Sequence, residues 1–269
     1  MSHEVQHAKC EAATLVCFAL KEEAASFRKL VTDNSEISIL ITGVGRQNAE
    51  KSIRDFLANR CGRANAPVSR PQDHLPDQAR LARTLAPPSL VLTCGFAGGL
   101  NPDLKPGEVV FEVANAPLAL SLSPPSGERV SVRTGEGLFS ELSAAGAKRV
   151  KFFCADRIVI TAAEKKKLRA ETGADAVEME SEAIHAICRE RGIPCATVRV
   201  ISDTAHEDLP LDFNALAKPD KNLDFGKLAW AIAKSPGKIP KLMELQKKTK
   251  FAAQQLAAVL EKMILENQP

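Results

Sequence analysis

Short apolar runs alternate with amphipathic segments along most of this chain. The apolar runs have the length and the β-branched content of buried strands, and the segments between them repeat apolar residues at helical spacing. The runs that predict strands span 14–20, 37–42, 89–93, 109–113, 150–154, 157–160 and 195–201. The patterns that predict helices span 21–30, 48–57, 137–145, 164–172, 175–191, 223–233 and 241–265. Strands that alternate with helices predict one α/β domain.

The segment 175–205 combines a helix and a strand in one continuous unit. A helix is predicted to begin near Asp175, with one apolar face formed by Met179, Ala183, Ala186 and Ile187. Gly192 ends this helix, and Pro194 prevents it from resuming. Residues 195–201 then alternate as a strand does, interrupted only by Arg199.

Polar side chains gather at both ends of this unit. Ser202 and Asp203 follow the predicted strand, and the carboxyl ends of strands are where open α/β sheets bind ligands. Glu178 and Glu180 stand at the predicted helix start. We therefore expect this unit to form the functional site.

Two glycine turns follow predicted strands. The first, Gly43-Val44-Gly45, reads G-x-G-x-x-N and lacks the third glycine of a dinucleotide fingerprint, which argues against a Rossmann oxidoreductase. The second places Gly95, Gly98 and Gly99 within five residues. Glycines at such positions allow a ligand to approach the backbone closely.

The remaining segments suggest how the domain is bounded. One domain is expected over 12–269, with a Pro- and Arg-rich surface insert at 63–88 and a C-terminal helix at 239–266. The loops 118–134 and 206–220 are polar and carry no readable motif.

Composition narrows the class of protein. Hydrophobic residues make up 45% and charged residues 26%, as in an ordinary globular enzyme. A net charge of +3, with 4% aromatic residues and no Tyr, argues against a nucleic-acid partner. No apolar run is long enough for a membrane span, and no signal peptide is recognised. The seven cysteines include no C-x-x-C pair, so a reduced, cytoplasmic protein is expected.

Five motifs in order resemble the purine nucleoside phosphorylase/nucleosidase superfamily. They are Glu22-Glu23 after the first strand, T-G-V-G at 42–45, G-x-A-G-G-L at 95–100, V-E-M-E at 177–180 and V-I-S-D at 200–203. The A-G-G-L form is most similar to methylthioadenosine/S-adenosylhomocysteine nucleosidases. The tail after Ala205 is similar to hopanoid-associated phosphorylases, which act on an adenosyl lipid. The resemblance implies a three-layer αβα domain with a mixed, partly barrel-like sheet flanked by helices.

The resemblance also implies cleavage of the bond between ribose and a purine. Its transition state is oxocarbenium-like, so an acid is needed for the base and oxygen ligands for the sugar. Asp203 would protonate a purine ring nitrogen with help from Ser202, and Glu180 would accept hydrogen bonds from the ribose hydroxyls, with Met179 against the sugar. Glu23 would position the attacking water.

Other assignments follow from the same resemblance. The base pocket would be lined by Gly95, Phe96, Ala97, Ile158 and Val159. Glu178 is a second candidate for substrate contact, or it stabilises the helix start. No metal-ligand spacing is present, so His185 is expected to be structural. Pairing with a carboxylate is the simplest account of Arg199, and a phosphate or nucleoside role is the alternative.

The nucleophile is either water or phosphate. Thr93 and Phe96 stand where the phosphorylase branch carries an arginine and a serine, which favours water. Arg46 and Gly45 remain as possible anion-binding residues. The sequence thus favours a nucleosidase that releases adenine, and a phosphorylase using inorganic phosphate as co-substrate is the alternative. A non-catalytic nucleoside-binding module is the alternative of another class. The expected partner is a small purine nucleoside, no other cofactor is expected, and a homo-oligomer is expected, with a dimer favoured.

Overall fold

A computed structural model describes residues 14–64, 87–114, 135–218 and 224–265 of the chain. The strands are β1 (Thr14–Phe18), β2 (Ile37–Ile41), β3 (Leu90–Gly99), β4 (Val109–Val113), β5 (Lys148–Arg149), β6 (Phe152–Cys154), β7 (Ala176–Glu178) and β8 (Cys195–Asp203). The helices are α1 (Lys21–Leu30), α2 (Arg46–Ala64), α4 (Gly135–Ala144), α5 (Ala162–Thr172), α6 (Ser181–Arg191), α7 (Phe225–Lys234) and α8 (Ile239–Leu265), with a short 3-10 helix at Pro236–Lys238.

The described strands form one mixed sheet. Its main path runs β2-β1-β3-β8-β4-β5, parallel except where β4 meets β8. The end of β3 also pairs with β7, which carries β6 beside it. β3 and β8 lie side by side at the centre, with Gly95 opposite Arg199. Residues at the ends of these two strands are therefore brought together by the sheet itself.

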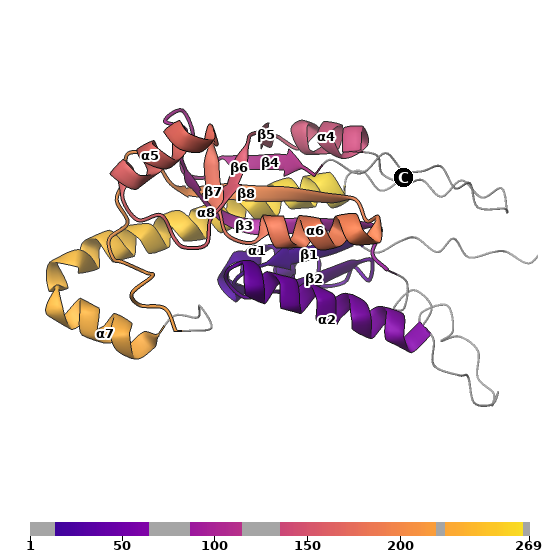
Figure 1. The fold of residues 1–269 in the computed structure, drawn as a ribbon, viewed down its shortest axis with the longest axis horizontal. Helices are drawn as coiled ribbons and strands as arrows, with labels where there is room; N and C mark the ends of the chain where they lie inside the picture. The colour runs from indigo at the N-terminus through magenta and orange to yellow at the C-terminus, as the bar shows by residue number, and fades with distance from the viewer. Residues whose placement is uncertain (1–13, 65–86, 115–134, 219–223, 266–269) are drawn as a thin grey trace, which may run out of the picture.

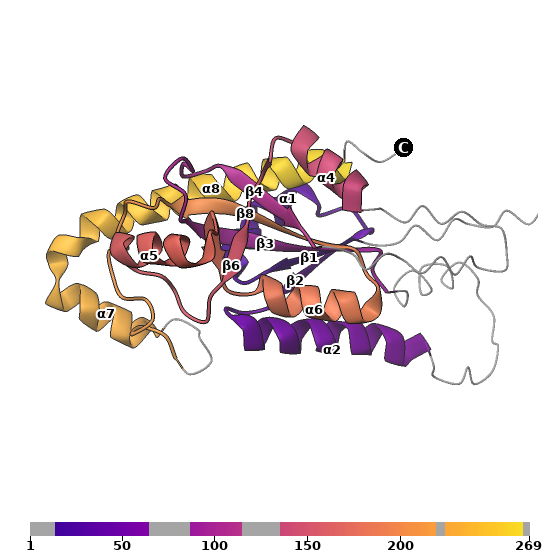
Figure 2. The same ribbon diagram turned by 45° about the horizontal axis from the view of Figure 1, so that its top comes forward.

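Helices cover both faces of the sheet, as Figures 1 and 2 show. On one face α1, α4 and the second half of α8 pack on β1, β3, β4 and β8 in the largest apolar cluster. On the other face α2 and α6 pack on β1, β3 and the start of β8. The three-layer α/β architecture with a mixed sheet is therefore confirmed.

Several predicted boundaries were wrong. The segment that begins at Asp175 is not yet helical: residues 176–178 form β7, and α6 begins only at Ser181. Ala176 and Val177 are both buried, in two different apolar clusters, and a count of helical spacing over so short a stretch does not reveal this. β3 continues through its glycines to Gly99 instead of ending at Thr93, because β8 and β7 supply hydrogen-bond partners along its whole length.

Three further segments differ from the expectation or lie outside the described residues. Residues 157–160 are not a strand; Ile158 is held in a loop by Asn214. α2 runs to Ala64, past the predicted end. Most of the expected insert at 63–88 and the whole of the loop at 118–134 lie outside the described residues. The expected C-terminal helix is α8.

Candidate functional site

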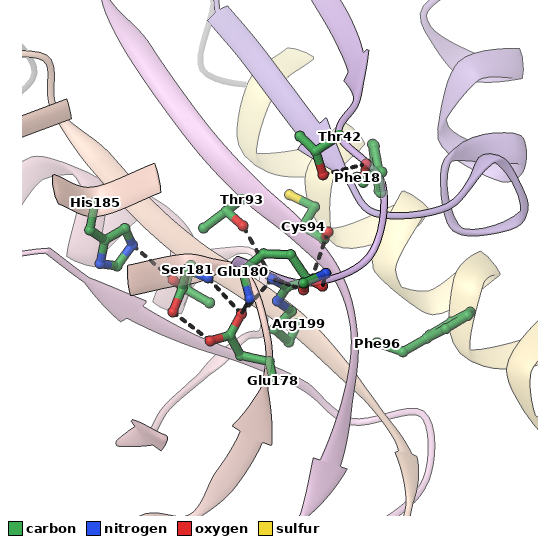
Figure 3. A network of polar contacts seen from close by, with 12 residues as sticks. Phe18, Thr42, Thr93, Cys94, Phe96, Glu178, Glu180, Ser181, His185 and Arg199 are labelled. Carbon is green, nitrogen blue, oxygen red and sulfur yellow. Dashed lines mark hydrogen bonds and ion pairs between the residues drawn. The ribbon is translucent and has the colours of Figure 1, made fainter. Parts of the chain in front are cut away.

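The guanidinium of Arg199 lies at the centre of a buried polar network (Figure 3). β8 places this side chain beneath β3, where it is only 1% exposed. Nη2 lies 2.7 Å from an oxygen of Glu178 and 3.1 Å from an oxygen of Glu180. Nη1 donates to the Cys94 carbonyl at 3.0 Å, and Nη2 also donates to the Thr93 hydroxyl at 3.2 Å. The predicted pairing of Arg199 with a carboxylate is therefore confirmed, with two carboxylates instead of one.

Glu178 ends β7 and organises the start of α6. Its side chain accepts hydrogen bonds from the Glu180 N–H at 3.0 Å and the Ser181 N–H at 2.8 Å, and from the Ser181 hydroxyl at 2.6 Å. Burial would raise the pKa of Glu178, but Arg199 and these hydrogen bonds outweigh burial and lower it. Glu178 is thus an ionised anchor between Arg199 and the helix start.

Glu180 joins the same network to the first glycine turn. One oxygen faces Arg199, and the other accepts the Gly45 N–H at 2.7 Å. Burial raises the pKa of Glu180 to about 7 against the attraction of Arg199, and the neighbouring Glu178 carboxylate raises it further. The Gly45 backbone, predicted as an anion site, therefore already donates to a carboxylate of the protein.

Glu23, in the first turn of α1, accepts a backbone hydrogen bond at the second glycine turn, as Glu180 does at the first. Its oxygens accept the Phe96 N–H and the Leu20 N–H, each at 3.0 Å. Burial raises the pKa of Glu23, although Arg199 and these N–H groups act in the opposite direction. A Cβ at Gly95, where φ is +145°, would lie 2.6 Å from Arg199 Nη1 and 2.8 Å from a Glu23 oxygen. Only glycine leaves room for both side chains here.

The Phe96 side chain does not enter this network. It points away from Arg199 in Figure 3 and packs against the apolar cluster that α8 shares with the sheet. Only its backbone N–H faces Glu23. The aromatic ring therefore does not fill the space beside the carboxylates.

A second polar cluster lies at the end of β8. Asp203 Oδ1 accepts the Ser202 hydroxyl at 2.6 Å, and Oδ2 lies 2.5 Å from Lys165 Nζ. The Ser202 hydroxyl also lies 3.2 Å from the Ala97 carbonyl, which connects this cluster to β3. A Cβ at Gly98 would come within 3.3 Å of Asp203 Oδ2, so the small residues of β3 make room for the aspartate.

The other predicted pocket residues lie around these two clusters. Met179 is half-buried in the bend between β7 and α6. Ile158 and Val159 are half-buried in the loop before α5, where Val159 packs against the small cluster around Leu100 and Val177. The structure therefore places Val159 near β7 and the residue that follows β3, and it shows a loop instead of the expected strand at 157–160.

Arg46 is engaged by acidic side chains. Its Nη2 lies 2.7 Å from Glu182 and 3.7 Å from Asp156, and the Glu182 and Asp156 carboxylates raise its pKa against the effect of burial. The guanidinium predicted to receive an anion is therefore already paired.

His185 lies on α6 and contacts β8. Its Nε2 is 2.9 Å from the Thr197 hydroxyl, and burial lowers its pKa to about 4, so the ring is neutral near pH 7. A cavity of about 280 Å³ beside it is lined by Glu112, Phe152, Phe153, Cys154, Ser181, Glu182, His185 and Arg189. Because neither Asp203 nor Glu23 lines this cavity, we do not place the reaction there.

Sequence reasoning missed Lys165. It is the first of three consecutive lysines, a run that normally indicates a solvated helix face. One feature of the sequence could have indicated its burial. Lys165 precedes Leu168 by three residues on α5, so the two share a helix face, and Leu168 packs inward. Its role is not visible without the fold, because its partner lies 38 residues away.

Comparison with known proteins agrees with this architecture. Residues 128–234 match the model of the phosphorylase superfamily. The aminodeoxyfutalosine nucleosidase of Campylobacter jejuni is 28% identical over 138 residues, which cover 46% of this chain and only 60% of the relative. A 5′-methylthioadenosine/S-adenosylhomocysteine nucleosidase of Staphylococcus aureus is 24% identical over 73% of this chain and 89% of the relative.

Solved structures show the same fold. Futalosine hydrolase of Helicobacter pylori aligns with a TM-score of 0.58 at 18% identity, covering 95% of this chain and 98% of that one. The 5′-methylthioadenosine/S-adenosylhomocysteine nucleosidase of Neisseria meningitidis aligns with a TM-score of 0.57 at 17% identity, covering 95% and 99%. These findings confirm the resemblance to the nucleoside phosphorylase/nucleosidase superfamily that the motifs predicted.

The network predicts a stability effect at Arg199. Arg199→Met would leave Glu178 and Glu180 buried without a counter-charge, which costs about 3–5 kcal/mol of unfolding free energy when a buried pair is broken. Urea denaturation of both proteins measures the difference. The matched control is Arg54→Met, because Arg54 also pairs with two glutamates but on the surface, and this variant should denature close to wild type. Equal losses in the two variants would contradict the central role of Arg199.

Proposed function

We propose that this protein hydrolyses the N-glycosidic bond of an adenosine-type purine nucleoside and releases adenine. One observation carries the choice of water over phosphate. At both glycine turns, a backbone N–H that could bind an anion instead donates to a carboxylate of the protein: Gly45 to Glu180 and Phe96 to Glu23. The matched relatives named as nucleosidases support the same reaction class.

The charges of the site also oppose phosphate. Glu23, Glu178 and Glu180 surround a single guanidinium, Arg199, whose Nη atoms are engaged by two carboxylates, a carbonyl and a hydroxyl. Phosphorolysis requires a cationic cradle, typically one with bidentate arginines. A phosphate placed here would face carboxylates, so the environment favours a neutral nucleophile.

The two clusters divide the reaction between sugar and base. Glu180 accepts hydrogen bonds from the ribose hydroxyls, with Met179 against the sugar, while Glu23 orients the attacking water and takes up its proton. The raised pKa of Glu23 makes this carboxylate a better base. Asp203 protonates the purine ring nitrogen, so the base leaves neutral. Asp203 follows Arg199 by four residues on β8, so the proposed acid for the base and the carboxylates around Arg199 lie at different positions along the same strand.

The test is adenine release from adenosine and from 5′-methylthioadenosine, in phosphate-free buffer and with phosphate added. We expect equal rates in both buffers, with loss of about 10²–10⁴-fold in Asp203→Asn because a general acid contributes that much. A requirement for phosphate would overturn hydrolysis. Absence of base release from every purine nucleoside would overturn the enzyme and favour a binding module.

Ionisation of Glu180 predicts the acid limb of the pH profile. With a folded-state pKa of about 7, Glu180 becomes protonated as pH falls, so kcat/KM should decline below about pH 7. Because that value lies above the ordinary 4.5, protonation of Glu180 also increases its contribution to stability between pH 7 and 4.5. The decline in kcat/KM is therefore not caused by a loss of stability when Glu180 becomes protonated. A decline in kcat/KM that persists unchanged in Glu180→Gln would contradict the assignment.

The proposal includes a homo-oligomer in a reducing, cytoplasmic setting. Trp230, Met243 and Phe251 expose 66%, 55% and 51% of their surface on α7 and α8, and a second copy of the chain would cover such apolar side chains. Cys17, Cys94, Cys154, Cys188 and Cys195 are free thiols. No helix among the described residues is long and apolar enough to cross a membrane. Light scattering after size exclusion should give a multiple of 29.0 kDa, and a monomer mass would contradict the oligomer.

A further inference from the structure

Lys165 has no place in the division of labour described above, yet it is completely buried. α5 directs its side chain to the end of β8, where its exposed fraction is 0%. Nζ contacts three oxygens: Asp203 Oδ2 at 2.5 Å, the Thr204 carbonyl at 2.7 Å and the Glu207 carbonyl at 2.8 Å. Burying a lysine is costly, and the adjacent Lys166 and Lys167 are exposed.

The three acceptor oxygens indicate that Lys165 carries a charged ammonium group. An ammonium group has three N–H donors and no acceptor, which matches three surrounding oxygens one for one. A neutral amine would instead direct a lone pair at one of these oxygens. The geometry therefore holds a positive charge at one oxygen of Asp203, while the Ser202 hydroxyl holds the other.

We propose that Lys165 is a positioning residue for the acid of this reaction, a role that rests on the proposed function. It fixes the orientation of Asp203 and stabilises the negative charge that appears on this carboxylate during catalysis. In the step concerned, the Asp203 O–H bond breaks and its proton forms an N–H bond with the purine ring. The electron pair of the breaking C–N bond moves into the purine, which leaves neutral.

The positive charge of Lys165 stabilises the transition state more than the bound substrate. Asp203 is neutral when it carries the proton and becomes anionic as the proton leaves, so the attraction of the nearby ammonium increases along the reaction. An interaction that is stronger in the transition state than in the bound substrate raises kcat and leaves KM little changed. The two carbonyl contacts hold the ammonium in place beforehand, so it does not have to reorient.

The experiment is a double-mutant cycle on adenine release from adenosine, using the full chain. The variants are Lys165→Met, Asp203→Asn and their combination, with exposed Lys166→Met as the matched control. We expect kcat of Lys165→Met to fall about ten- to hundredfold with KM within threefold, inside the range of acid catalysis. The double variant should be no slower than Asp203→Asn alone, because Lys165 acts only through Asp203. Lys166→Met should match wild type.

Other outcomes overturn the proposal. Lys165→Met with wild-type kcat would show that the ammonium has no role in the reaction. A further loss of tenfold or more in the double variant, or a KM increase that accounts for the loss, would indicate a general structural role instead. If Lys165→Met does not fold, Lys165→Gln keeps hydrogen-bond donors without the charge and must show the same kcat loss. An inactive wild-type protein would instead refute the proposed function, so the two failures are distinguishable.

Discussion

One buried guanidinium is the counter-charge that three buried acidic side chains share in this site. Arg199 is the shared counter-ion of Glu178 and Glu180 and lies against Glu23 across Gly95. Three carboxylates cannot be buried side by side without such a partner, because each would otherwise become protonated or destabilise the fold. The divergent pKa values of the two glutamates follow from this arrangement: Glu178 receives the hydrogen bonds that keep it ionised, and Glu180 receives fewer. The same network therefore keeps Glu178 ionised as a structural anchor and leaves Glu180 able to titrate near pH 7.

The sheet explains why distant residues meet at this place. β3 and β8 run parallel at its centre, so the glycine-rich end of β3 lies beside the polar end of β8. Glycines in β3 are needed because the Arg199, Glu23 and Asp203 side chains occupy the space where a Cβ would project. The same strands therefore supply the acidic groups and the room that they need.

Much of this could be predicted from the sequence, because alternation of strands and helices and the order of the motifs are local features. The β8 strand and the position of Asp203 at its end followed from residues 195–203 alone. The start of α6 was misplaced because the apolar spacing from Met179 to Ile187 does not mark where the helix begins, and the three residues of β7 are too few to show a strand pattern. Lys165 and the pairing of Arg46 were missed because both depend on partners from other elements, which spacing along the chain does not show.

The proposed hydrolysis requires water as the nucleophile, and it is favoured because one backbone N–H at each glycine turn already donates to Glu180 or Glu23. Phosphorus-31 NMR of a complete reaction with adenosine in excess inorganic phosphate tests this most directly. The account predicts free ribose and adenine, with inorganic phosphate as the sole phosphorus signal. A new sugar-phosphate signal that grows in step with adenine would contradict it.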